Sequence, residues 1–598
     1  MKVHYWKTQA RREHHLVREP MTIRSAFVTL VGIGCASTSG TGSRPAAEFP
    51  SRTELAALPS KAAPPTAFPT KDVVVESWTF QDAPPPDGAT YVDRSPWSDL
   101  VQAATAGKTV VLSAPLRCAA LELARFHLQH SALPAERLRR FMIARCGAVM
   151  PDAHPLVWWQ TVPPAMTEAQ LVQASKDLAT EIGRALTGGA KALGFAAVKK
   201  GDRLVVAGVV GTDDVHLEPG SRTLGANRMV TLRGTARATN FESIVGYVNH
   251  GEHGVEPCAS NPRFKPPRFV ITCKLAPADP FAWVELLGHV KGRFLDMAIA
   301  DIIVHEGDGR AVSYSVRSSG PPSPVKGAAD FDGLLVERLN RVRAAAKLAP
   351  LARADKQSRE NARLAGTLIE AQLGHDEPTA DRIARGLLAG WEVDGLIRAG
   401  HFFLGTVAPT RDLTVWLDYA LESPIGRLTL LDPAARQLAV GPAIPGDVAG
   451  LGAAVTTYAL FESDDHSADE ARVLQNLARA RGVVGAPPPV RVEGLAELGS
   501  ESALVLNKGK EPFDTLKDIL HAAAQRSGDH VSGWVMETSD LEYLDFPPEL
   551  LAQGELKVVV GVTHHRAPGA AWGQYVVFAL AIGGPPLRQA ATEPRPAG

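Results

Sequence analysis

The stretch Leu334–Leu351, LLVERLNRVRAAAKLAPL, decides the fold of the middle of the chain. Its apolar residues recur three and four positions apart, as on one face of a helix. These residues are Leu335, Leu339, Val342 and Ala346. The strands expected after Gly450 alternate poorly between apolar and polar residues, as strands buried on both faces do. Helices beside doubly buried strands predict an α-β-α sandwich.

A second stretch, Trp416–Leu431, reads WLDYALESPIGRLTLL. Together the two stretches resemble the CAP superfamily of cysteine-rich secretory, antigen-5 and pathogenesis-related proteins. The resemblance covers residues 331–465, about a fifth of the chain. It implies structural roles for five motif residues. These are Asn340, Arg343, Trp416, Ser423 and Pro424.

The resemblance also implies a cavity built from histidines and carboxylates, which can bind a divalent metal. His375 and His401 are the candidates for that cavity. Position 426, where the family carries a histidine after its Ser-Pro pair, is glycine. One surviving ligand does not make a metal site, so a degenerate domain without the cavity chemistry, and without a metal or other cofactor, is expected.

The composition is that of an ordinary globular chain. Its 598 residues contain 63 Lys and Arg and 64 Asp and Glu, a formal net charge of -1. Nucleic-acid binding needs concentrated positive charge, so no nucleic-acid partner is expected. At roughly 100–200 residues per domain, the length predicts about three to five domains.

The N-terminus indicates export. Residues 21–35, MTIRSAFVTLVGIGC, combine a basic residue, an apolar core and small residues before Cys35, which is typical of a signal peptide. The segment resembles a bacterial lipoprotein signal, which would attach a lipid to Cys35. A membrane partner through that anchor, on the outer membrane or cell surface, is then expected, with the periplasm or the extracellular space as the alternative. Translation can start at Met1 or at Met21, and a short buried apolar segment of a soluble protein remains the alternative to a signal.

Four further cysteines form an even set once Cys35 is modified. Neighbours along the chain would pair as Cys118–Cys146 and Cys258–Cys273. Four cysteines allow three connectivities, so spacing does not fix the pairing. Small buried hydrophobic residues are the alternative role for all five cysteines.

Shifts in composition divide the chain as a multi-domain α+β protein. The expected parts are a signal region (1–35), a flexible linker (36–72), an N-terminal α/β domain (73–216), a β-rich, sandwich-like module (217–315), a linker (316–330), a CAP-like domain (331–485), a C-terminal α+β domain (490–583) and a disordered tail (584–598). A weak internal repeat of apolar strands occurs at 193–210, 451–461 and 556–581. It makes a duplicated α/β domain one possible arrangement.

Other histidines offer weaker signals. His250-Gly-Glu-His253 is expected to be a polar loop tip without metal, and His564-His565 a solvated turn after a strand. Glu122, His127 and His130 can form the polar face of an amphipathic helix near Cys118. The chain contains no His-Glu-x-x-His, no Gly-x-Ser-x-Gly and no phosphate-binding Gly-Lys-Ser/Thr loop, so no catalytic residue can be named.

These patterns favour a non-enzymatic envelope lipoprotein that binds a protein, glycan or lipid ligand through its CAP-like and companion domains. A secreted hydrolase acting on peptides or cell-wall material is the alternative. A purely structural surface protein is the third possibility.

Overall fold

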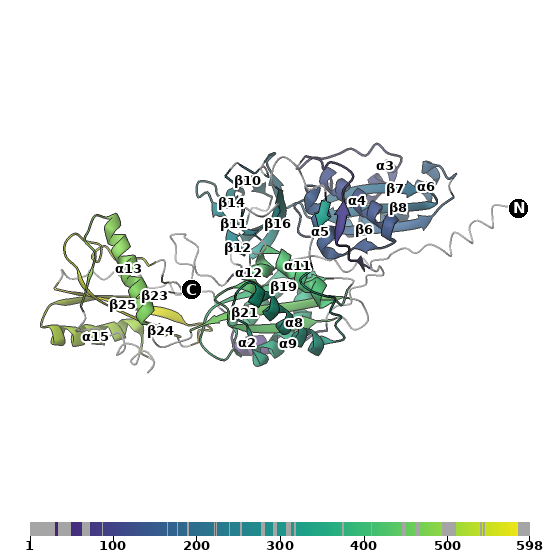
Figure 1. Cartoon of the computed structure of the whole chain (residues 1–598). Coiled ribbons are helices and arrows are strands. Elements are labelled where there is room, and N and C mark those ends of the chain that lie inside the picture. The colour runs from purple at the N-terminus through teal and green to yellow at the C-terminus, as the bar shows by residue number, and fades with distance from the viewer. Residues whose placement is uncertain are drawn as a thin grey trace. The chain divides into compact units, whose positions relative to one another are not determined.

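The computed structural model describes residues 30–33 and most of residues 49–583. Its description leaves out 1–29, 34–48, 63–71, 493–509 and 584–598, together with short stretches between residues 87 and 568. The chain forms two compact units. Unit 1 holds residues 1–33, 52–388 and 401–457, and unit 2 holds residues 34–51, 389–400 and 458–598. Both units mix helices with β-structure: unit 1 contains several β-sheets, and unit 2 contains the four-stranded sheet β22-β24-β25-β23 (Figure 1).

The N-terminal αβα domain (residues 98–211) belongs to unit 1. Its elements are α3 Ser98–Thr105, β4 Val111–Leu112, α4 Ala114–His130, α5 Glu136–Arg145, β6 His154–Thr161, α6 Glu168–Ala174, α7 Asp177–Thr187, β7 Ala192–Lys200 and β8 Arg203–Gly211. The sheet order is β4-β7-β8-β6. Helix α4 packs on one face of this sheet with Val205 and Ala207, and α7 packs on the other face with Leu193 and Val206. A two-stranded pair beside this domain joins β2 Asp72–Val73 to β5 Leu133–Pro134.

The β-rich module consists of two sheets that share one core. The strands are β9 Val215–Leu217, β10 Met229–Ala236, β11 Phe241–Asn249, β12 Val255–Pro257, β13 Ala259–Ser260, β14 Arg268–Lys274, β15 Phe281–Val290 and β16 Asp296–His305. One sheet has the order β13-β14-β10-β9, and the other runs β12-β11-β15-β16. Inward residues such as Leu232, Ile271 and Val284 fill the space between the sheets. Two short strands, β3 Ser77–Thr79 and β17 Ser313–Ser315, pair separately.

The central αβα domain (residues 328–460) carries the motif stretches. Its elements are α8 Ala328–Ala345, β18 Ala352–Arg353, α9 Asp355–Leu373, α10 Glu377–Ala389, β19 Ile397–Val407, α11 Leu413–Glu422, α12 Pro424–Leu431, β20 Gln437–Ala443 and β21 Leu451–Leu460. The sheet order is β19-β21-β20-β18. Helices α8 and α11 share a core with Val440 and Val455, and α9 lies against β20 so closely that a Cβ on Gly441 would sit 2.3 Å from the Asn361 backbone. A short helix, α2 Arg52–Ala56, packs Leu55 against Gly386.

Residues Leu30–Ile33 form β1, which pairs antiparallel with β16 and with β19. This strand joins the β-rich sheet and the central sheet into one nine-stranded sheet. The sequence allowed two interpretations for this apolar segment, a signal peptide or a short buried apolar segment, and in the full chain Leu30–Ile33 form a strand. Cys35 lies outside the described residues.

The C-terminal αβα domain (residues 467–582) repeats this plan within unit 2. It contains α13 Ser467–Val483, β22 Val490–Arg491, α15 Pro512–Ser527, β23 Val531–Thr538, β24 Lys557–His565 and β25 Gln574–Ile582. The sheet order is β22-β24-β25-β23. Val473 of α13 covers one face with Val558 and Val560, and Leu516 of α15 covers the other face with Val559.

All three αβα domains thus share one strand order, with a two-residue edge strand parallel to its neighbour. The backbone register is the same in each: the amides of Val111, Ala352 and Val490 donate to the carbonyls of Lys191, Arg436 and Leu556. The weak repeat in the sequence corresponds to β7–β8 at 193–210, to β21 alone at 451–461, where its partner β20 was not included, and to β24–β25 at 556–581. A single αβα plan therefore recurs three times along the chain.

Three sequence expectations need correction. Helix α13, expected at the end of a domain spanning 331–485, packs on β24 instead, because its apolar face completes the core of the C-terminal domain. The single helix expected over 167–186 is two helices, α6 and α7, separated at Ser175. Strand β11 was missed, and it pairs with β15 along its whole length.

Candidate functional site

Two motif residues on helix α8 bind backbone groups. The Asn340 side chain accepts from the Leu351 amide (2.8 Å) and donates to the Leu351 carbonyl (3.1 Å). Arg343 is fully buried and donates to carbonyls of Ala349, Leu430, Asp432 and Ala435. A guanidinium has five donors and no acceptor, so all four carbonyl groups can accept from Arg343. We call this set of buried hydrogen bonds from one arginine to several carbonyl groups a tie.

Arg481 makes the equivalent tie in the C-terminal domain. It is also buried and donates to Pro487, Leu550, Ala552 and Gly554. The same role in a second copy of the fold identifies the buried arginine as a feature of the αβα plan.

The remaining motif residues shape the bend between α11 and α12, which we call the elbow. Trp416 is buried and donates from Nε1 to the Gly405 carbonyl (3.0 Å). Ser423 ends α11 and caps α12, where its Oγ accepts from the Gly426 amide (3.4 Å). Pro424 occupies the first turn of α12, where its missing N–H costs nothing.

Gly426 has no room for a side chain. A Cβ there would lie 2.2 Å from the Ala420 carbonyl oxygen and 3.0 Å from the Phe403 ring. Glycine at the position of the family's histidine is therefore required by the packing of this elbow.

Of the two histidines expected in the cavity, the structure describes His401 but not His375. His401 lies in β19 and is buried, with Nε2 3.3 Å from Oδ2 of Asp432. Burial would raise the pKa of Asp432, but the hydrogen bond and charge of His401 outweigh it and hold that pKa below its ordinary value. His375 lies outside the described residues. The described part of the chain holds no cluster of three or more His, Cys, Asp or Glu side chains suited to a metal.

Residues of the β-rich module cap both helix ends at the elbow. Asn249 of β11 donates from Nδ2 to the carbonyls of Leu421 (3.0 Å) and Glu422 (2.8 Å) at the end of α11. Glu285 of β15 accepts from the Ser423 hydroxyl (3.0 Å) and the Ile425 amide (3.2 Å) at the start of α12. A donor thus meets the negative end of one helix and a carboxylate the positive end of the next.

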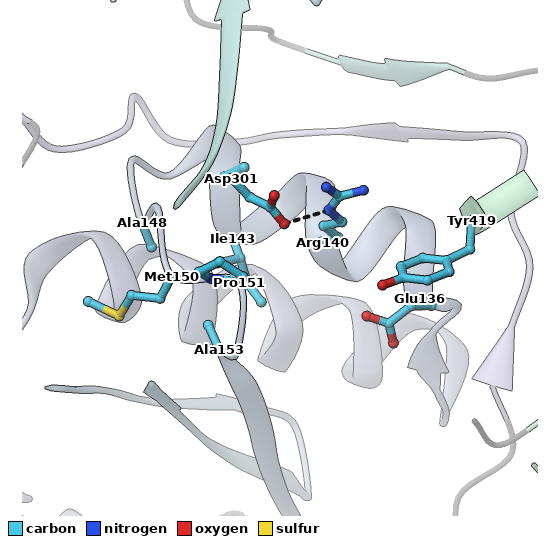
Figure 2. A pocket seen from close by; sticks show the side chains of 10 residues that line it. Glu136, Arg140, Ile143, Ala148, Met150, Pro151, Ala153, Asp301 and Tyr419 are labelled. Carbon is cyan, nitrogen blue, oxygen red and sulfur yellow. Dashed lines mark hydrogen bonds and ion pairs between the residues drawn. The ribbon is translucent and has the colours of Figure 1, made fainter. Parts of the chain in front are cut away.

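Helix α5 adds charged contacts where the β-rich module meets the elbow. We call this meeting of α5, β15, β16 and the elbow the joint. Arg137 lies 3.3 Å from Asp418 and 3.4 Å from Glu422. Arg140 donates from Nε to Asp301 Oδ2 (2.9 Å) and lies over the Trp283 ring, 4.3 Å from its centroid. Figure 2 shows Arg140 and Asp301 pointing toward each other beside Tyr419.

A small cavity of about 20 Å³ lies at this joint, lined by the polar residues Glu136, Arg140, Asp301 and Tyr419 and by apolar residues such as Ile143 and Met150 (Figure 2). Its volume suits about one water molecule. Burial and the neighbouring charge of Asp301 raise the pKa of Glu285 to about 7. No sequence signal marked Glu285 or Asp301, because their partners lie far away along the chain.

Helix α4 carries buried polar residues. The sequence allowed these residues to form the solvated, polar face of an amphipathic helix. Glu122 is 1% exposed and accepts from Trp78 Nε1 (3.2 Å). His127 is fully buried against the Trp159 ring, and burial together with the charge of Arg203 lowers its pKa to about 4. His130 stacks on Phe126. Glu122 and His127 therefore belong to the core rather than to a polar face, whereas His130 is half-buried.

The His564-His565 pair is also not a solvated turn, because both residues extend β24. His564 Nδ1 lies 2.9 Å from His466 Nε2, and His466 Nδ1 lies 2.9 Å from Asp469 Oδ2. His565 is buried on the opposite face of the strand. His250 is buried as well and accepts from the Ala276 amide (3.1 Å), whereas residues 251–253 lie outside the description.

Two disulfides join Cys118 to Cys146 and Cys258 to Cys273, the pairs of chain neighbours. Disulfides persist in oxidising compartments, which indicates a protein outside the cytoplasm. Within the described residues, none of the helices combines the length and apolar character that a membrane crossing needs.

No protein-family model matches the chain. No curated protein is significantly similar to it. Among solved structures, a cysteine-rich secretory protein from Staphylococcus aureus subsp. aureus Mu50 is similar, at 14% identity and a TM-score of 0.17. The match covers 41% of this chain and 83% of that one. A TM-score this low carries no argument about fold or function.

Proposed function

We propose that this chain is an exported cell-envelope protein with a degenerate CAP-like domain at residues 331–465 and a neighbouring β-sandwich-like module. It acts by binding a protein, glycan or lipid ligand. The observation that carries the proposal is the use of the motif residues. Asn340, Arg343 and Trp416 bind backbone groups, and Ser423 caps a helix and binds Glu285.

Gly426 supports the same conclusion. The 2.2 Å distance from its built Cβ to the Ala420 oxygen excludes the side chain that the family's cavity would need at this position. His401 contacts a single carboxylate, that of Asp432. A binding or scaffolding role fits a domain whose polar residues stabilise its own backbone.

Cosedimentation tests the binding role against the hydrolase alternative. Full-length protein is mixed with purified cell-wall sacculi and, separately, with vesicles of anionic and zwitterionic lipids. The proposal predicts pelleting with one of these surfaces and no release of soluble wall fragments or peptides. Release that an Asp469→Asn or His466→Gln change abolishes would favour the hydrolase.

Lipid attachment at Cys35 belongs to the same proposal and has its own test. Mass spectrometry of the mature protein from the native envelope should find a diacylglyceryl group on Cys35, and Cys35→Ser should abolish it. Cleavage before Cys35 removes β1, so a mature chain that retains Leu30–Ile33 would contradict the anchor and favour the strand.

A further inference from the structure

Five buried carboxylates gather where helix α5, strands β15 and β16 and the elbow meet. They are those of Glu136, Glu285, Asp301, Asp418 and Glu422. The guanidiniums that bind carboxylates there are those of Arg137, Arg139 and Arg140, whereas Arg145 of α5 donates to the Asp82 carbonyl and Arg427 of α12 to the Leu421 carbonyl. Unpaired negative charge in a buried site is costly, so a buried group with no counter-ion tends to become neutral.

The pairing of these groups singles out Glu285. Arg139 binds Glu136, Arg137 binds Asp418 and Glu422, and Arg140 binds Asp301. Glu285 is 1% exposed and has only the Ser423 hydroxyl and the Ile425 amide as hydrogen-bond donors among the contacts described.

Glu285 and Asp301 are also direct cross-strand partners in β15 and β16. Side chains in such a pair have Cβ atoms about 5 Å apart. Tyr247 of β11 lies opposite Glu285 on its other side, and Arg140 is the one guanidinium that acts on both carboxylates in the described surroundings. Arg140 is hydrogen-bonded to Asp301, and a buried carboxylate whose neighbour binds the shared cation tends to keep its own proton.

The small cavity has space for a water molecule beside Asp301 and Arg140. Asp301 Oδ1 and Arg140 Nη1 have no protein hydrogen-bond partner among the described residues, and both residues line the cavity. One water molecule fits there and can bond to both groups.

We propose that Glu285, the cross-strand neighbour of Asp301 with no guanidinium bound to it among the described contacts, holds a proton when this joint is closed, and that loss of the proton loosens the contact of α5 and the elbow with β15 and β16. The joint is then a proton-dependent lock between the N-terminal domain, the β-rich module and the central domain. The proposal does not rest on the ligand-binding role proposed above.

The direction of the pH dependence follows from the pKa of Glu285. Burial raises it from the ordinary 4.5 to about 7, so the folded joint binds more protons than the unfolded chain between these values. Its contribution to stability is therefore complete below about pH 4.5 and is lost as the pH rises to about 7.

Hydrogen–deuterium exchange of the full-length protein at about pH 5 and about pH 8 tests the lock across this window. After correction for intrinsic exchange rates, peptides covering α5 and the elbow should lose about tenfold in protection at the higher pH. Glu285→Gln keeps the shape and an acceptor oxygen but cannot ionise, so it should reduce the loss to below about twofold.

Glu218→Gln, an exposed carboxylate of the same module, should behave as the wild type. Two results would overturn the proposal: protection of the wild type that does not change with pH, or a loss of protection in Glu285→Gln as large as in the wild type. If Glu285→Gln does not fold, Asp301→Asn provides the test, because it removes the carboxylate next to Glu285 and leaves the guanidinium of Arg140 in place. The loosening should then move to lower pH, and an unmoved midpoint would overturn the proposal.

Discussion

At the scale of single residues, the elbow depends on glycine at position 426, which has no Cβ atom. Gly426→Ala would place a methyl group 2.2 Å from a backbone oxygen that cannot move without bending α11. We expect a loss of about 1–3 kcal/mol in stability, by analogy with overpacked cores. Thermal unfolding of unit 1 measures it.

Gly333→Ala is the matched control for that change. Gly333 lies on the exposed side of α8, and nothing would lie within 4 Å of its Cβ. Alanine there should stabilise the helix by about 0.5–1 kcal/mol. A destabilisation of the same size at both positions would contradict the packing argument.

His127 gives the N-terminal domain a pH dependence opposite in sign to that of Glu285. Its pKa is lowered from 6.5 to about 4, so between these values the folded state stays neutral while the unfolded chain takes up a proton. Stability should therefore fall by up to about 3 kcal/mol as the pH drops from about 6.5 to about 4.

His127→Phe should remove this component, since a phenyl ring fits beside Trp159 and does not titrate. Unfolding midpoints at about pH 7 and about pH 5 measure the difference. His130→Phe, on the same helix, is the control. Equal acid sensitivity in the wild type and in His127→Phe would refute the assignment.

At the scale of secondary-structure elements, strand β11 holds the end of helix α11. Asn249→Asp replaces the donor that binds two carbonyls with a carboxylate that repels them. We expect a loss of about 2–4 kcal/mol and faster amide exchange at the end of α11. The control is Asn261→Asp, whose side chain is exposed and accepts from the Arg263 amide, which aspartate also can do. If Asn249→Asp leaves the stability and the amide exchange of α11 unchanged, the β-rich module does not cap the elbow.

The elements differ in how well the sequence predicts them. Helical spacing located α8, and the composition of residues 217–315 indicated the β-rich module, because these patterns are local. The residues Asn249 and Glu285 could not be found in this way. Their partners in the elbow lie 172 and 138 positions away, and no local pattern encodes such a contact. The strand residue His564 was mistaken for a turn residue for the same reason, since its partner His466 lies 98 positions away.

At the scale of the whole molecule, the recurrence of one αβα plan predicts separable unfolding of the two units. Arg343 in unit 1 and Arg481 in unit 2 make equivalent buried ties to carbonyl groups. Calorimetry should resolve two transitions. Arg343→Met should lower one of them and Arg481→Met the other, each by about 5–10 °C for a loss of about 2–4 kcal/mol.

Arg341→Met is the control for both changes. Its side chain is 65% exposed, so its contact with Glu337 adds little stability. One cooperative transition that both substitutions lower together would contradict the division into two units.

The central claim is that the motif residues of the central domain stabilise its fold and its joint with the β-rich module rather than forming a metal-binding cavity. Calorimetric titration of Zn²⁺ into the full-length wild type and into His401→Gln tests it most directly. We predict the same isotherm for both, because His401 binds Asp432 and Gly426 leaves no space for a second imidazole. A site of one ion per chain that His401→Gln abolishes would contradict the claim.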